Sequence, residues 1–196
     1  MREASFSGRK AERFSEELYM ISDVTVLGTK SEPCVSLSYL SMVRFAAQNS
    51  DRWNMRYPNK ASFDKKHLKL DIIENDPVND LLAGMAMGML IQIYDYNPTL
   101  FIPEVSFCGI SIKDKYRQDN PHTDHENDKD YIKVLGLLNN DWECDVDGGE
   151  FLYEDKKIPL SPGQFVVFNP RKVHRSADII SDKKRFGIDF TVKRKK

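Results

Sequence analysis

The positions of apolar residues divide this chain into two halves with different periodicities. Over residues 36–49 they recur at spacings of three and four, which predicts a helix with one apolar face (Leu37, Leu40, Val43 and Ala47). A second helix is expected from Asp76-Pro77 to about Tyr94, because Asp can cap a helix and Pro is tolerated at its first position. Gly84 and Gly88 leave one side of that helix without bulk and predict close packing there. The first hundred residues are therefore expected to be mainly helical.

After Pro98 the pattern changes to short runs of β-forming residues separated by Asp, Asn, Gly and Pro. Many short strands with turn signals between them favour a sandwich or barrel. The expected strands are Glu104–Lys113, Tyr131–Leu138, Glu150–Tyr153, Gln164–Asn169 and Phe186–Val192. Because no internal repeat or low-complexity linker interrupts the chain, we expect residues 1–196 to form a single domain. In it, residues 1–100 would be mainly helical support and residues 101–196 a β-core.

The last expected strand alternates in polarity. Alternate residues of a strand point to opposite faces. One face would carry Phe186, Ile188 and Phe190, and the other Arg185, Gly187 and Asp189.

Composition narrows the class of protein. A chain of 196 residues with 40% hydrophobic and 30% charged residues can bury a substantial core and is typical of a soluble globular protein. The formal net charge of −1 argues against wholesale nucleic-acid binding, and the basic end Lys193–Lys196 is interpreted as a solvated terminus.

Three cysteines without CxxC spacing favour reduced thiols. The first residues lack the apolar segment of a signal peptide, and the longest apolar run, Leu81–Ile91, is too short to cross a bilayer. We therefore expect a cytoplasmic location and no membrane partner. The oligomeric state stays open.

The sequence His122-Thr123-Asp124 is the leading candidate for chemistry. Side chains at positions i and i+2 of an extended segment point the same way, so His122 and Asp124 could grip one face of a metal. His174 follows an aromatic strand and the Asn169-Pro170 turn, and could complete the set. Two histidines and one carboxylate with open positions are the ligands of non-haem Fe(II) oxygenases. We therefore predict His122, Asp124 and His174 as metal ligands.

The competing histidines His125 and His67 are interpreted as solvated, since His125 would point to the opposite face of the strand and His67 lies in a charged stretch. Arg185 opens a strand eleven residues after His174. Its guanidinium offers a rigid fork of donors that suits a carboxylate, which makes it the candidate anchor for a dicarboxylate co-substrate. Lys183 and Lys184 are the alternatives.

From about Glu104 to Val192 the chain resembles the Fe(II)/2-oxoglutarate-dependent dioxygenases, specifically the prolyl 4-hydroxylase-like branch that includes the oxygen-sensing prolyl hydroxylases. The matching stretches are His122–Asp124, Leu138–Trp142, Asp147–Phe151, Gly163–Phe168, His174-Arg175 and Arg185–Ile188. The resemblance implies a mainly β fold with supporting helices, in which a double-stranded β-helix (jelly-roll, cupin-like) core packs against the N-terminal helices.

The resemblance also implies a set of ligands. Iron(II) would be held by His122, Asp124 and His174, and the distal carboxylate of 2-oxoglutarate by Arg185. Molecular oxygen would be the second co-substrate, and ascorbate is a candidate additional cofactor.

One family feature is missing. Family members often carry a Tyr inside the barrel that assists the 2-oxoglutarate carboxylate, and Gly136 and Leu137 stand where it is expected. Tyr131, Tyr116 and Ser111 are the candidates for this second contact.

The expected activity is hydroxylation of a peptidyl proline with release of succinate and CO2. A free amino acid, another small molecule or a nucleobase is the alternative substrate. The segment Arg52–Asp64 is a candidate wall of a peptide groove, although its aromatics are better interpreted as packing residues. Two other classes stay open: a cupin-like metal-binding module without this chemistry, and a zinc hydrolase, which would have no need for Arg185.

Overall fold

The structure is a computed structural model that describes residues 24–50, 54–55, 68–71, 81, 84–85, 101–124 and 131–194. In chain order its elements are β1 (Thr25–Leu27), α2 (Leu37–Gln48), β2 (Asn54–Met55), β3 (Leu68–Asp71), β4 (Phe101–Lys113), β5 (Tyr131–Leu137), α4 (Cys144–Asp147), β6 (Phe151–Tyr153), β7 (Lys156–Ile158), β8 (Phe165–Phe168), β9 (His174–Ser176) and β10 (Arg185–Arg194). No helix among these described residues is both long and apolar enough to span a membrane.

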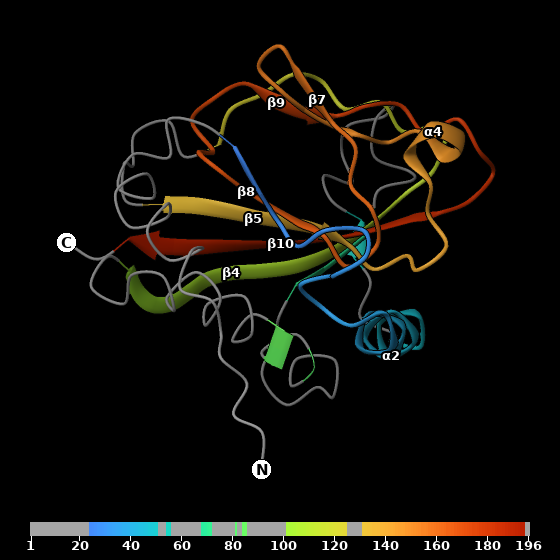
Figure 1. Cartoon of the computed structure of the whole chain (residues 1–196), viewed down its shortest axis with the longest axis horizontal. Helices are drawn as coiled ribbons and strands as arrows, with labels where there is room; N and C mark the ends of the chain where they lie inside the picture. The colour runs from blue at the N-terminus through green and yellow to red at the C-terminus, as the bar shows by residue number, and fades with distance from the viewer. Residues whose placement is uncertain are drawn as a thin grey trace.

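The strands form two antiparallel sheets. The large sheet has seven strands in the order β1-β8-β5-β10-β4-β3-β2, and the small sheet has three in the order β7-β6-β9. In Figure 1 the long strands β4, β5 and β10 cross the middle of the molecule, with β7 and β9 in a layer above them and α2 below. The large sheet is thus the central layer.

Strand β8 shows how the large sheet buries both of its faces. All of its residues, Phe165–Phe168, are buried. The first and third pack in a core cluster with Leu40 and Val43 of α2. The second and fourth pack in another cluster with Phe151 and Tyr153 of β6. A strand buried on both faces loses the alternation of apolar and polar residues, which explains this continuous apolar run.

Helix α2 confirms the helix predicted over residues 36–49. The Ser36 side chain accepts a hydrogen bond from the backbone N–H of Tyr39 and caps the first turn. The Tyr39 hydroxyl donates to the carbonyl oxygen of Leu81. A Cβ added to Gly84 would lie 2.8 Å from the Tyr39 hydroxyl oxygen, so the predicted close packing is confirmed at Gly84. The apolar face of α2 is buried through Leu40, Val43 and Ala47, whereas Leu37, predicted for the same face, is 43% exposed.

The five strands predicted after Pro98 are all confirmed, the largest shift being the start of β4 at Phe101 instead of Glu104. Of the helix predicted from Asp76-Pro77 to Tyr94, the described residues are Leu81, Gly84 and Met85, which are helical. The rest of that helix lies outside the described residues.

Sequence analysis missed the short elements. Strands β1, β2 and β3 come from the half that was expected to be mainly helical, yet they join the large sheet. Strands β7 and β9 and helix α4 were missed as well. Each of these missed elements has only two to four residues, too few to show a periodic pattern by itself. That the whole chain is one domain stays a prediction.

Candidate metal centre

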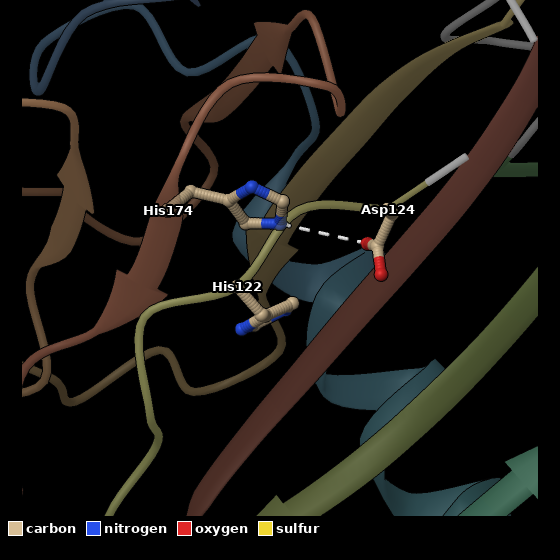
Figure 2. Close-up of side chains that lie close together, drawn as sticks. All are labelled: His122, Asp124 and His174. Carbon is tan, nitrogen blue, oxygen red and sulfur yellow. Dashed lines mark ion pairs between the residues drawn. The ribbon is translucent and has the colours of Figure 1, made fainter. Parts of the chain in front are cut away.

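Two segments far apart in the sequence bring His122, Asp124 and His174 together. The candidate ligand atoms of these three side chains all lie within 4.8 Å of one another. The ring centroids of the two histidines are 4.5 Å apart, and His174 Nε2 lies 3.5 Å from Asp124 Oδ2 (Figure 2). A group of this size and composition could hold a metal ion.

The backbone explains why these side chains meet. His122 and His174 face each other in an antiparallel bridge, and each donates its backbone N–H to the carbonyl oxygen of the other, at 3.1 and 2.9 Å. The backbone N–H of Asp124 donates to the carbonyl oxygen of Pro170 at 2.7 Å. The segment carrying His122 and Asp124 therefore lies alongside residues 170–174. This arrangement brings His174 next to the other two side chains, as its predicted role as a metal ligand requires.

Hydrogen bonds fix which ring nitrogen of each histidine faces the cluster. His122 Nδ1 lies 2.9 Å from the carbonyl oxygen of Asn120, and His174 Nδ1 lies 2.8 Å from that of Lys172. A carbonyl oxygen only accepts, so Nδ1 carries the proton in both rings. Nε2 is therefore the nitrogen that faces the cluster in each ring, and it is the atom through which either histidine would bind a metal.

The Asp124 carboxylate is held in its charged form. Burial raises the pKa of Asp124, but hydrogen bonding to His174 and the charge of Lys133 outweigh burial and hold it well below its usual range. Lys133 Nζ lies 2.5 Å from Asp124 Oδ2 and 3.6 Å from Asp189 Oδ2. Sequence analysis did not identify Lys133 as part of the site. The feature that could have revealed it is a charged residue inside the otherwise apolar strand Tyr131–Leu137.

The surroundings of the cluster differ from one side to the other. His174 is 5% exposed, and its ring centroid lies 4.8 Å from that of Phe168 and 5.9 Å from that of Phe151. His122, by contrast, is exposed and Asp124 is half-buried. The candidate centre therefore has one apolar wall and one side open to solvent.

Arg185 is buried, and some of its hydrogen-bond donors have no partner among the described residues. It is 1% exposed, and its Nε and Nη2 atoms find no hydrogen-bond partner among the described residues. Burial lowers the pKa of Arg185, and the Asp119 carboxylate opposes that effect. Of the three cations considered as anchors, Lys183 and Lys184 are exposed, and Lys183 already bonds to Asp147 Oδ2 at 2.9 Å.

Two glycines leave room beside the Arg185 side chain. A Cβ on Gly149 would lie 3.2 Å from Arg185 Cδ. One on Gly187 would lie 3.3 Å from Arg185 Nη1 and 3.2 Å from Ser111 Oγ. Larger residues at either position would crowd the guanidinium. Ser111 is thus the one of the three candidates for the second contact that lies close to Arg185.

The other two candidates lie elsewhere. Tyr116 is 67% exposed and has its ring under Lys115 Nζ. Tyr131 pairs with Lys193 at the end of β5 opposite to Leu137, about 20 Å away along the strand.

The two positions where the family Tyr is expected are filled for structural reasons. A Cβ on Gly136 would lie 2.5 Å from the Phe165 ring, so this position must be glycine while that ring packs there. Leu137 is buried in the cluster between the sheets, together with Trp142 and Phe151. Of the other predictions, those for His125 and His67 lie outside the described residues, as does nearly all of Arg52–Asp64.

Sequence analysis also missed a group of charges next to Arg185. In the register of the large sheet Arg185 lies opposite Lys113, which bonds to Asp119 Oδ2. Asp119 Oδ1 accepts from Arg117 Nε at 2.9 Å. Burial raises the pKa of Asp119, but the charges of Lys113 and Arg117 outweigh it and hold that pKa far below its usual range. Arg117 and Asp119 precede His122 in a loop whose sequence resembles any charged surface segment.

The fold of this chain is similar to that of solved oxygenase structures. No protein-family model and no curated protein matches the chain. Solved structures do match, and those most similar in fold include 2-oxoglutarate- and iron-dependent oxygenases and prolyl hydroxylases.

Three of the matching structures show the range of enzymes that share this fold. A Pseudomonas putida prolyl-4-hydroxylase matches 95% of this chain and 100% of its own with a TM-score of 0.65 and 13% identity. A Trichoplax adhaerens prolyl hydroxylase in complex with a peptide fragment of hypoxia-inducible factor matches 94% and 89%, with a TM-score of 0.67 and 14% identity. The epimerase SnoN in complex with Fe3+, α-ketoglutarate and nogalamycin RO matches 95% and 84%, with a TM-score of 0.70 and 10% identity. At such identities the likeness establishes a shared fold.

Proposed function

We propose that this protein is an Fe(II)- and 2-oxoglutarate-dependent oxygenase built on a double-stranded β-helix. One observation carries the proposal: the His122–Asp124–His174 cluster occurs in the same molecule as a buried Arg185 whose Nε and Nη2 atoms lack a partner among the described residues. A metal centre alone fits many chemistries. A metal centre combined with an interior cation that needs an anion fits a co-substrate with a carboxylate.

In this proposal the metal is held by Nε2 of both histidines and by the Asp124 carboxylate. The carbonyl oxygens of Asn120 and Lys172 keep the two rings in the required tautomer and orientation. When bound, the iron supplies the activation of oxygen that no side chain can provide. The apolar wall formed by Phe168 and Phe151 excludes water from one side of the site.

Arg185 would hold the distal carboxylate of 2-oxoglutarate and thereby fix the orientation of the co-substrate. The fit rests on the two unpartnered guanidinium atoms and on the space left by Gly149 and Gly187. A zinc hydrolase or a cupin-like binding module would have no use for a buried arginine in this state. Leaving such donors unsatisfied costs about 1–3 kcal/mol, which favours a ligand that pairs with them.

For the substrate we propose a peptidyl proline. Support comes from the two prolyl hydroxylases among the similar structures, one of them bound to a peptide. A small molecule is the second candidate, because the similar epimerase binds nogalamycin RO. Hydroxylation would release succinate and CO2, and the exposed side of the cluster at His122 is where substrate would approach.

A succinate-release assay tests the proposal. Purified protein with Fe(II), 2-oxoglutarate and ascorbate is incubated with proline-containing peptides, free amino acids, other small molecules or oligonucleotides. We expect substrate-dependent succinate with one of these classes and none with His174→Ala, while His67→Ala, outside the motif, keeps the activity. Omitting ascorbate tests the predicted additional cofactor. Undiminished activity of His174→Ala would refute the ligand assignment.

The identity of the metal has its own test. Anaerobic addition of Fe(II) and then 2-oxoglutarate should give a weak visible charge-transfer band. Absence of the band, together with tight retention of zinc, would favour the hydrolase instead.

A further inference from the structure

We infer that Lys113, and not a tyrosine, supplies the second contact to the distal carboxylate of 2-oxoglutarate, so that this carboxylate lies between two buried cations, Lys113 and Arg185. The inference rests on the proposed function and names the co-substrate contact that sequence analysis left open.

Strand pairing places the two cations side by side. Lys113 is the last residue of β4 and Arg185 the first of β10, and they are direct partners in the antiparallel register. Burial lowers the pKa of Lys113, Asp119 raises it, and the positive charge of Arg185 lowers it further. The two charges are thus close enough to repel each other in an interior that screens poorly. An anion between them would relieve that repulsion.

Lys113 reaches across the space between the two sheets. Its Nζ lies 3.5 Å from the Oγ of Ser176, which belongs to β9 of the small sheet. Ser176 follows His174 by two residues on that strand, so both side chains point to the same face. Two residues of a strand span about 7 Å. The Lys113 ammonium therefore lies near the metal cluster. A co-substrate that binds the metal at one end and Lys113 at the other would need such a spacing.

Asp119, the carboxylate that pairs with this group among the described residues, does not neutralise it. Asp119 bonds through Oδ2 to Lys113 and through Oδ1 to Arg117. Both of its oxygens are therefore engaged, while Nε and Nη2 of Arg185 have no partner among the described residues. Among the described residues, Lys113, Arg117 and Arg185 thus share the one Asp119 carboxylate. The excess of positive charge suits an incoming carboxylate, and Asp119 holds the Lys113 side chain in place for it.

The two positions where the family tyrosine is expected carry residues that cannot donate a hydrogen bond to the carboxylate. Leu137 packs in the cluster between the sheets, and Gly136 faces the Phe165 ring on the opposite side of β5. Neither can donate a hydrogen bond from a side chain. On β4, Ser111 and Lys113 stand two residues apart on one face, and the Ser111 hydroxyl adjoins the space beside Arg185. The donor for the carboxylate comes instead from β4, which lies on the other side of β10 from β5.

The test compares two ligands that differ only at the distal end. Under anaerobic conditions with Fe(II), 2-oxoglutarate and 2-oxopentanoate, which lacks the distal carboxylate, are titrated against the protein, and binding is measured from the charge-transfer band and by calorimetry. Lys113→Met should weaken 2-oxoglutarate about 10- to 100-fold, the loss expected for one charged hydrogen bond. It should leave 2-oxopentanoate within about twofold. Lys115→Met, which removes an exposed lysine paired with Asp182, is the matched control and should change neither.

Removing Lys113 leaves Asp119 buried without its partner, so the double variant Lys113→Met/Asp119→Asn is measured alongside. Fe(II) affinity and the unfolding midpoint of each variant report whether the fold and the metal site persist. The inference is refuted if folded variants bind 2-oxoglutarate as tightly as the wild type, or if both ligands weaken equally. If the wild type itself binds Fe(II) but not 2-oxoglutarate, the proposed function fails as well, which separates the two failures.

Discussion

Replacing Arg185 by Met should make the protein more stable and remove its response to 2-oxoglutarate. Arg185 is 1% exposed, and two of its donor atoms have no partner among the described residues. A Met side chain keeps the apolar stem but carries no charge. The wild-type residue is therefore expected to lower stability in the absence of co-substrate and to raise it once co-substrate binds.

The magnitude follows from these two atoms. Leaving a buried donor unsatisfied costs about 1–3 kcal/mol, and the nearby Asp119 carboxylate offsets part of that cost for the charge as a whole. We expect Arg185→Met to raise the free energy of unfolding by about 1–3 kcal/mol in the absence of ligand. For the wild type, 2-oxoglutarate at a hundred times its dissociation constant adds about 2.7 kcal/mol. For a chain of this size that is a rise in Tm of about 5–10 °C.

The assay is urea and thermal unfolding with Mn(II) in place of Fe(II), with and without 2-oxoglutarate. Arg185→Met should show a higher urea midpoint than the wild type and no shift on addition of ligand. Lys115→Met, a lysine of an exposed ion pair, should keep the wild-type ligand shift. A variant that is less stable than the wild type without ligand would show that the guanidinium is satisfied within the protein, and the main support for a carboxylate ligand would be lost.

Three further predictions concern the frame around the site. Gly136→Ala should destabilise the protein by about 1–3 kcal/mol in urea unfolding, because the new Cβ would lie 2.5 Å from the Phe165 ring. In a Phe165→Leu background most of that loss should disappear, and an unchanged loss would contradict the steric explanation. Ser36→Ala should cost about 1 kcal/mol through the lost cap of α2. Ser38→Ala, inside the same helix, should cost less; equal losses would exclude the cap as the cause. The pKa of Asp119 is held far below its usual range when folded, so its contribution to stability is present above about pH 4 and is lost as the pH falls further. Between pH 6 and pH 3 the urea midpoint of the wild type should fall more steeply than that of Asp119→Asn, whereas parallel curves would mean that Asp119 is not ion-paired in solution.

The elements that the sequence predicted well are those with a clear period. Helix α2 carries an apolar stripe at helical spacing, and β10 alternates, so that Phe186, Ile188 and Phe190 join the core facing α2 while Arg185 turns to the other face. The short strands that were missed are defined by their partners in the sheets; β9, for example, pairs with β6. The same holds for the three strands that the first half contributes to the large sheet.

By itself the sequence determined which side chains are candidates for the metal centre. The HxD spacing and the order of His174 and Arg185 after it identify them, since ligand type and alternation are local properties of a chain. The tertiary structure decided what surrounds them. Only the pairing of β4 with β10 places Lys113 opposite Arg185, and only the packing of Phe165 explains why Gly136 carries no side chain. Lys133 beside Asp124 and Asp119 between its two cations are pairs close in the sequence, but they depend on how the folded chain turns between them, which the pattern of residues did not reveal.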